Sequence, residues 1–334
     1  MRVVLKSPLD MHLHLRDGKM LKSVARYTSK CFAGAIVMPN LVPPVTTIDE
    51  VKAYKERIKE ATKGDIFEPY MTLFFKNDYS YEFLKEAKEF VKAIKLYPSG
   101  ITTNSDGGVS SFEVENLRET LEAMSELGLP LSIHGETDGF VLDREREFGK
   151  FYETLSKAFP KLKIIMEHIS DRHSLELLKD HENLYATITL HHLLITLDDV
   201  IGGSLNPHLF CKPIVKRYED REALQEIVLS GYDKVMFGSD SAPHPKEKKE
   251  RAMGAAGIFS SPILLPALCE LFEKNGKLEN LQRFVSDNAQ KIYEIEPLEK
   301  SVVLIKKEFE VPVVCDDVVP MFAGEKLLWR CESE

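Results

Sequence analysis

The sequence predicts an α/β protein built on a (β/α)₈ TIM barrel with a short C-terminal extension. Eight short apolar runs alternate with amphipathic segments between residues 1 and 240, as strands and helices do in such a barrel. The length of 334 residues suits one barrel domain with additions. Polar residues capable of chemistry follow several of the apolar runs, and barrel enzymes place their active sites at those strand ends.

The expected strands are short apolar runs bounded by polar or turn-forming residues. The first contains residues 3–5 and continues into a segment with two histidines; the others are 32–38, 67–75, 93–96, 129–134, 162–166, 184–190 and 234–238. The expected helices between them are 20–30, 48–62, 81–91, 112–127, 144–158, 174–179 and 219–229. Thr47 and Glu50 have the spacing of a capping box, and Gly128 is suited to end the fourth helix.

The remaining chain is expected to close the barrel and extend beyond it. Residues 261–274 and 278–293 resemble helices, and 302–305 and 311–314 resemble short strands. No repeat or linker divides the sequence, so we expect one domain over residues 1–334, with the barrel at about 1–295 and the extension at about 296–334. A dinucleotide-binding protein is disfavoured, because no G-x-G-x-x-G motif follows the first strand.

The composition is that of a globular protein, with 43% hydrophobic and 29% charged residues. The net charge of −9 argues against nucleic acid or an anionic membrane as the main partner, although a local cluster of cations can still bind a small anion. The five cysteines are widely spaced and predict no disulfide framework. Without a signal-like or membrane-spanning apolar run, we expect a soluble, cytoplasmic protein.

The first chemical signal is the pair His12 and His14. On an extended segment, two residues two apart point to the same face, and two converging imidazoles make half of a metal site. Further candidates also stand at strand ends: Asn40, Lys95, His134, His168 and Asp240. Since the carboxyl ends of barrel strands meet, we expect these residues to lie close together.

Each of these residues also has a structural interpretation when taken alone. His134 or His168 could be a hydrogen-bonded core histidine, Asp240 a helix cap, and Lys95 a side chain reaching solvent. Taken together, four histidines and one aspartate exceed the needs of one Zn²⁺, so either two metals are present or some of these residues bind substrate. An ammonium group has no lone pair, so Lys95 would be either a cation for the substrate or a chemically modified ligand.

Five stretches in combination resemble the dihydroorotase family of the amidohydrolase superfamily, most closely the short bacterial type that functions alone. They are DMHLHLRDG at 10–18, MPN at 38–40, KLYP at 95–98, PHLFCKP at 207–213 and GSDSAPH at 238–244. The resemblance spans the expected barrel. It implies a reversible hydrolysis of a cyclic amide, between dihydroorotate and N-carbamoyl-L-aspartate, in the synthesis of pyrimidine nucleotides.

The resemblance also implies a ligand set for two Zn²⁺ ions. Lys95 would be carboxylated on its amine (N6-carboxylysine) and would bridge the two metals. His12, His14 and Asp240 would complete one metal site, and His134 and His168 the other. A hydroxide bridging the metals would attack the ring carbonyl, with Asp240 as general base and then general acid.

Substrate contacts follow from the same resemblance. Arg16, two residues beyond His14, has a guanidinium fork suited to a carboxylate, and Asn40 and His244 would share that contact. Backbone groups of Lys212 and Ala256 would touch the pyrimidine ring, although Lys212 stands where close relatives would carry an apolar residue. The polar segment 98–111 would fold over the substrate through Thr102 and Thr103.

Several of these residues also have an interpretation in which they do not contact the substrate. Arg16 could pair with Asp17 on the surface, His244 could be an ordinary loop histidine, and the 98–111 segment could be a solvated loop. Residues 246–251 are expected to form a solvated, mixed-charge face. The remaining histidines are expected to be structural or on the surface: His173, His181, His191, His192 and His208.

Two alternative functions share most of this pattern. Another cyclic amidase, such as a hydantoinase or allantoinase, would keep the metal site and differ around Arg16, Asn40 and the threonine loop. A non-catalytic subunit related to dihydroorotase would act in assembly, but such chains usually lose ligands and this one keeps them all. The resemblance further suggests a homodimer acting on a small anionic substrate.

Overall fold

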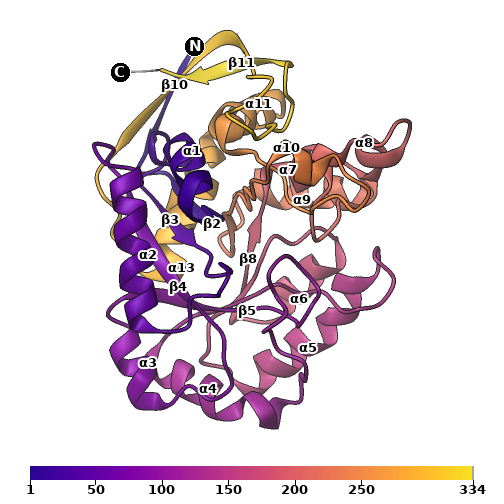
Figure 1. Ribbon diagram of the computed structural model, residues 1–334. Coiled ribbons are helices and arrows are strands. Elements are labelled where there is room, and N and C mark those ends of the chain that lie inside the picture. The colour runs from indigo at the N-terminus through magenta and orange to yellow at the C-terminus, as the bar shows by residue number, and fades with distance from the viewer. Residues whose placement is uncertain (333–334) are drawn as a thin grey trace.

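Eight parallel strands follow one another around a barrel in the computed structural model, which describes residues 1–332 (Figure 1). Each strand pairs with the next along the chain, from β2 to β9. The strands are β2 (Leu9–Leu13), β3 (Gly34–Val37), β4 (Glu68–Phe74), β5 (Val91–Leu96), β6 (Leu131–Ile133), β7 (Ile164–Met166), β8 (Leu184–Ile188) and β9 (Val235–Phe237). The predicted TIM barrel is confirmed.

The helices between the strands lie where the sequence predicts them, with small shifts at their ends. They are α1 (Gly18–Ser29), α2 (Ile48–Ala61), α3 (Tyr81–Ala87), α4 (Val114–Leu127), α5 (Arg144–Ala158), α6 (His173–Asp180) and α9 (Tyr218–Ser230). The capping box of Thr47 and Glu50 begins α2, and Gly128 ends α4 in a left-handed conformation at φ 68°.

The last part of the barrel contains more helix than expected. The connection after β8 holds α7 (Leu190–Leu194), α8 (Leu197–Ile201) and a 3₁₀ turn at Pro207–Leu209. A short helix α10 (Lys246–Lys249) follows β9, and a 3₁₀ turn at Ser261–Ile263 precedes the closing helices. The closing helices are α11 (Leu264–Lys274), α12 (Leu278–Gln282) and α13 (Asn288–Tyr293), the last two joined by a π-helical turn at Arg283–Asp287.

Both ends of the chain build a separate antiparallel sheet in the order β1–β10–β11, made of β1 (Arg2–Lys6), β10 (Ser301–Glu310) and β11 (Lys326–Cys331) (Figure 1). This corrects two expectations. Residues 3–5 belong to this sheet and not to the barrel, and residues 311–314 form no strand. Pro312 explains the second error, because proline cannot donate a ladder hydrogen bond. The strand β11 was not predicted.

The strands β9 and β2 form no continuous ladder within residues 1–332. A few hydrogen bonds close the barrel between them. The backbone N–H of Asp240 donates to the carbonyl of His12 (2.8 Å), and that of His14 donates to Ser241 (3.2 Å). The buried carboxylate of Asp10 accepts bonds from the backbone N–H (2.7 Å) and the hydroxyl (2.6 Å) of Ser239. The closure therefore brings His12 and His14 beside Asp240.

Apolar side chains pack at the amino ends of the barrel strands, opposite the end at which the predicted site residues lie. A cluster that includes Leu9, Ile36, Ile165 and Met236 packs against α13. Lys163, which precedes β7, donates to the Ile292 carbonyl, so α13 covers the amino ends of the strands. No helix in the described residues is long and apolar enough to cross a membrane.

Candidate metal centre

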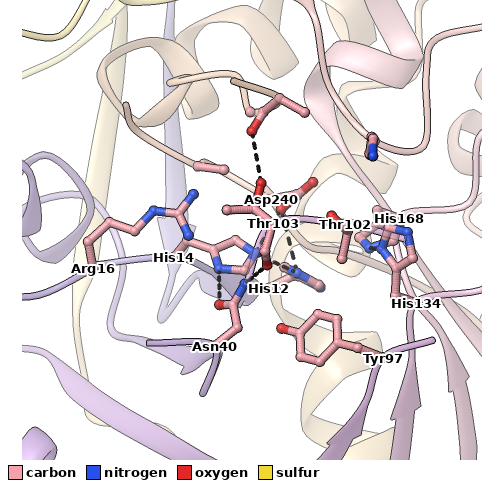
Figure 2. A pocket seen from close by; sticks show the side chains of 14 residues that line it. His12, His14, Arg16, Asn40, Tyr97, Thr102, Thr103, His134, His168 and Asp240 are labelled. Atoms are coloured by element: carbon pink, nitrogen blue, oxygen red, sulfur yellow. Dashed lines mark hydrogen bonds and ion pairs between the residues drawn. The ribbon is translucent and has the colours of Figure 1, made fainter. Parts of the chain in front are cut away.

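The predicted histidine and aspartate ligands meet at the carboxyl ends of the strands (Figure 2). His12 lies near the end of β2 and His14 just beyond it, while His134, His168 and Asp240 follow β6, β7 and β9. They line a single pocket together with other residues predicted for the site and with Tyr97. The predicted residues on its wall are His12, His14, Arg16, Asn40, Thr102, Thr103, His134, His168, Lys212, Asp240 and Ala256.

Three potential ligand atoms converge at the first half of the site. The Nε2 atoms of His12 and His14 are 3.3 Å apart, and Oδ1 of Asp240 lies 3.1 Å from His14 Nε2 and 3.6 Å from His12 Nε2. Burial lowers the pKa of both histidines, so both imidazoles are neutral near pH 7.

The orientation of each imidazole is set by a partner on its opposite nitrogen. His12 Nδ1 donates to Glu167 (2.8 Å), and His14 Nδ1 donates to the side-chain carbonyl of Asn40 (2.9 Å). Both Nε2 atoms therefore carry lone pairs. Two lone-pair nitrogens and a carboxylate oxygen have no proton to share, so a cation between them is the group that satisfies all three.

The second half of the site repeats this arrangement with two histidines. His134 Nε2 contacts the carboxylate of Glu136 (2.6 Å), which leaves His134 Nδ1 facing His168 Nε2 at 3.1 Å. The ring centroids of His168 and His12 are 4.9 Å apart, so the two halves adjoin.

Glu136 and Glu167 are further candidate site residues, to which the sequence alone assigned no role. Histidines that bind metals generally donate their other ring N–H to a carboxylate or carbonyl, and these glutamates provide such partners. Burial opposes ionisation of Glu167, but its interactions with His12 and Lys95 lower its pKa to about 2. Their positions in the sequence could have indicated this role, since Glu136 stands two residues after His134 and Glu167 directly precedes His168.

Lys95 on β5 is fully buried, at 0% exposure, so the interpretation of a side chain reaching solvent is wrong. Its Nζ has no hydrogen-bond partner among the described residues and lies 5.0 Å from the centre of the Tyr97 ring. Burial lowers the pKa of Lys95 to about 8, against the opposing charges of Glu167 and Asp240. An unpartnered amine at this depth is costly unless another group completes the site.

The backbone bends sharply at three of the site residues. Arg16, His168 and Asp240 have positive φ angles of 60°, 41° and 42°. Such conformations are uncommon for residues other than glycine and cost about 1–3 kcal/mol each. These three residues follow β2, β7 and β9, so the backbone is strained at the site.

Arg16 lies at the edge of the pocket and points toward it (Figure 2). Its guanidinium contacts the Pro243 carbonyl (3.3 Å) and His244 Nε2 (3.3 Å). The surface pairing with Asp17 is wrong, because Asp17 binds Arg57 instead. His244 contacts this guanidinium, although it is not among the residues that line the pocket.

The 98–111 loop is docked over the site. Asn40 donates to the Thr103 carbonyl (3.0 Å), and the Thr103 hydroxyl lies 3.5 Å from the Ala256 carbonyl. The ammonium group of Lys212 donates to the Ile101 carbonyl (2.6 Å), which gives this unusual lysine a side-chain role as well. The interpretation of a fully solvated loop is therefore wrong for these residues.

Residues 246–251 were expected to form a solvated face, and this expectation is wrong for Lys249. Lys249 is 3% exposed and donates to the carbonyls of Phe210 (2.9 Å) and Gly257 (2.6 Å). These bonds fasten the segment that carries Ala256. The charge pattern alone gave no sign that one lysine of the run points inward.

A second group of potential ligands consists of His191, His192 and Cys211, whose ligand atoms lie within 4.8 Å of one another. Both ring nitrogens of His192 have partners, namely Thr189 Oγ1 (2.9 Å) and the Pro213 carbonyl (3.0 Å). The Cys211 thiol also donates to Pro213 (3.2 Å). Neither ring nitrogen of His191 has a hydrogen-bond partner among the described residues. All three residues are buried, as the structural interpretation of these histidines expects.

Comparisons with known proteins agree with this geometry. The model of the amidohydrolase family matches residues 8–298. A curated dihydroorotase of Helicobacter acinonychis is 47% identical over 339 residues, covering 100% of this chain and 99% of its own. The chain belongs to the dihydroorotase family.

Solved structures of dihydroorotases superpose on nearly the whole chain. A crystal structure from Campylobacter jejuni is 58% identical with a TM-score of 0.96, covering 99% of this chain and 98% of that one. The enzyme from Saccharomyces cerevisiae, solved in complex with 5-fluoroorotic acid, is 34% identical with a TM-score of 0.92, covering 100% of this chain and 99% of that one. The predicted family is confirmed, and with it an enzyme of the amidohydrolase class.

Proposed function

We propose that this chain is a zinc-dependent dihydroorotase that interconverts dihydroorotate and N-carbamoyl-L-aspartate in the synthesis of UMP. The observation that carries the proposal is the orientation of the histidines. Glu167, Asn40 and Glu136 each occupy one ring nitrogen of a histidine, so that the other nitrogens face the pocket. Membership of the dihydroorotase family supplies the reaction.

The donor set fits two zinc ions. His12, His14 and Asp240 would hold one ion, and His134 and His168 the other. Zinc bound there would polarise the ring carbonyl and lower the pKa of water.

Lys95 is suited to become the bridging ligand. The neutral amine is the form that adds CO₂, giving a carbamate and releasing a proton. A buried amine whose pKa is lowered to about 8 is neutral far more often than an exposed lysine. The carbamate would also replace an unpartnered ammonium by a ligand with two oxygens.

Asp240 would move the proton. Its carboxylate lies against both His12 and His14, and burial raises its pKa above the usual value. A carboxylate poised in this way can accept a proton at Oδ and deliver it to the departing ring nitrogen.

Specificity would come from the substrate carboxylate. The fork of Arg16 offers paired donors, and its contacts with Pro243 and His244 fix its direction. Asn40 and His244 would share the carboxylate, while backbone groups of Lys212 and Ala256 would touch the ring. Thr102 and Thr103 would cover the substrate and exclude water.

Two further parts of the proposal rest on composition and family resemblance. We propose a homodimer located in the cytoplasm.

The test compares substrates on the zinc-loaded chain. We expect dihydroorotate to be hydrolysed with a kcat/KM at least about 100-fold above that for hydantoin or allantoin, because only its carboxylate engages Arg16. Preference for hydantoin or allantoin would indicate another cyclic amidase. No turnover of any of the three by a zinc-loaded, folded chain would indicate the assembly subunit.

A further inference from the structure

Two cysteines from opposite ends of the chain touch each other far from the metal centre. The sulfurs of Cys31 and Cys331 are 3.5 Å apart although the residues are 300 positions apart in sequence. Cys31 follows the end of α1, and Cys331 ends β11. Both are half-buried, and their thiols are free in this structure.

We propose that Cys31 and Cys331 are a redox modification site, forming a reversible disulfide that ties β11 to the end of α1. The co-reactant is a small disulfide such as oxidised glutathione. This inference stands independently of the proposed reaction, because neither cysteine lines the active-site pocket.

The backbone on both sides of the pair is already fixed. Cys331 pairs with Leu304 on β10, which holds the end of β11. On the other side, Lys300 donates to the carbonyls of Ser29 and of Phe32 (3.0 Å), which flank Cys31. The two sulfurs need to approach by about 1.5 Å to bond, which is within reach of side-chain rotation.

The environment selects Cys31 as the attacking thiolate. Its hydrogen bond with Cys331 lowers the pKa of Cys31, and the cationic Lys300 and Lys30 act in the same direction, against burial. The same contact raises the pKa of Cys331. A thiol with a lowered pKa beside cations is the type that reacts first.

The exchange is balanced in two steps. The Cys31 thiolate attacks one sulfur of oxidised glutathione, which forms a mixed disulfide and releases one glutathione thiolate. The Cys331 thiol then loses its proton and attacks the Cys31 sulfur, which releases the second glutathione thiolate. Two protein thiols are oxidised and one glutathione disulfide is reduced to two thiols.

The other three cysteines are poor competitors. Cys211, Cys269 and Cys315 are all buried, and burial raises the pKa of each thiol, to about 12 for the first two. Oxidation should therefore be confined to the one pair.

The experiment equilibrates the full chain with mixtures of oxidised and reduced glutathione, followed by alkylation, intact mass and non-reducing peptide mapping. We expect the oxidised chain to lose two hydrogens, to yield a single Cys31–Cys331 peptide and to regain both thiols with dithiothreitol. Its melting temperature should rise relative to the reduced chain, because the link joins segments far apart in sequence. Cys31→Ser and Cys331→Ser should each abolish the link and the shift, while the control Cys315→Ser keeps both.

Mass and peptide mapping of the unsubstituted chain test the proposal even if a variant folds poorly. Persistence of both thiols in fully oxidised glutathione would overturn the proposal. So would a mixed disulfide that never resolves, or a link between two other cysteines.

Discussion

Three of the four histidines of the site have one ring nitrogen held by a neighbouring side chain, which leaves the other nitrogen for the pocket. Glu167 and Asn40 fix Nε2 of His12 and His14 toward Asp240, whereas Glu136 fixes Nδ1 of His134 toward His168. The sequence predicts the histidines because they end strands. It does not predict their partners, because ring orientation depends on contacts between residues far apart in the chain, such as His12 and Glu167.

Replacing Asp240 by Asn should damage the chemistry more than the binding of substrate. The amide cannot take up the proton, so kcat should fall about 10²–10⁴-fold while KM changes little. Steady-state kinetics at matched zinc content provide the check. A variant with normal kcat and a raised KM would contradict the role of Asp240 as proton carrier.

Replacing Glu167 by Ala should weaken metal binding. His12 would lose the acceptor that orients its ring, and the loss of such a partner typically costs 10–100-fold in affinity. Competition with a chromophoric chelator measures the affinity, and far-UV circular dichroism confirms folding. The control is Glu176→Ala on the exposed face of α6. Equal zinc affinity in the two variants would exclude the role assigned to Glu167.

At the scale of elements, the 98–111 loop is held over the pocket by residues of other loops. Asn40, Ala256 and Lys212 hold it through Thr103 and Ile101. Glycine content and polarity predict a loop here. They do not predict that it is docked, because the contacts come from three other strand–helix connections.

The double substitution Thr102→Ala, Thr103→Ala should lower kcat/KM by about 10–100-fold, the equivalent of two lost hydrogen bonds. Initial rates with dihydroorotate provide the measurement. Ser110→Ala, an exposed position in the same loop, is the control. Kinetics unchanged in both variants would remove the loop from turnover.

The start of α2 offers a test of stability. Thr47→Ala should lower the free energy of unfolding by about 1 kcal/mol at pH 7, and Thr154→Ala on the exposed side of α5 should not lower it. Burial opposes ionisation of Glu50, yet hydrogen bonds from Thr46 and Thr47 lower its pKa below 4.5.

The pH dependence follows from the direction of that shift. Since the folded pKa of Glu50 lies below the unfolded value, its contribution is present above about pH 4.5 and fades as the pH falls through the folded pKa. Urea titrations should therefore show the deficit of Glu50→Gln shrinking below pH 4.5. A deficit independent of pH would contradict the capping box as its cause.

At the scale of the whole molecule, the barrel was predictable, whereas the sheet outside it was predicted only at residues 302–305, which lie in β10. Alternating runs of strand and helix are local signals, so β3 to β9 and the helices between them are found from the sequence. The pairing of β1 with β10 joins residues about 300 positions apart, and no local sequence pattern predicts it. The same holds for Asp10 and Ser239, whose bonds help to close the barrel.

The central claim is that Lys95 holds a pair of metals in a dihydroorotase site. The most direct test is the zinc content of the purified chain after equilibration with zinc and bicarbonate and removal of loose metal. The account predicts about two zinc ions per chain and no more than about one in Lys95→Ala, which cannot form the bridge. A full pair of zinc ions in Lys95→Ala, or none in the unsubstituted chain, would contradict it.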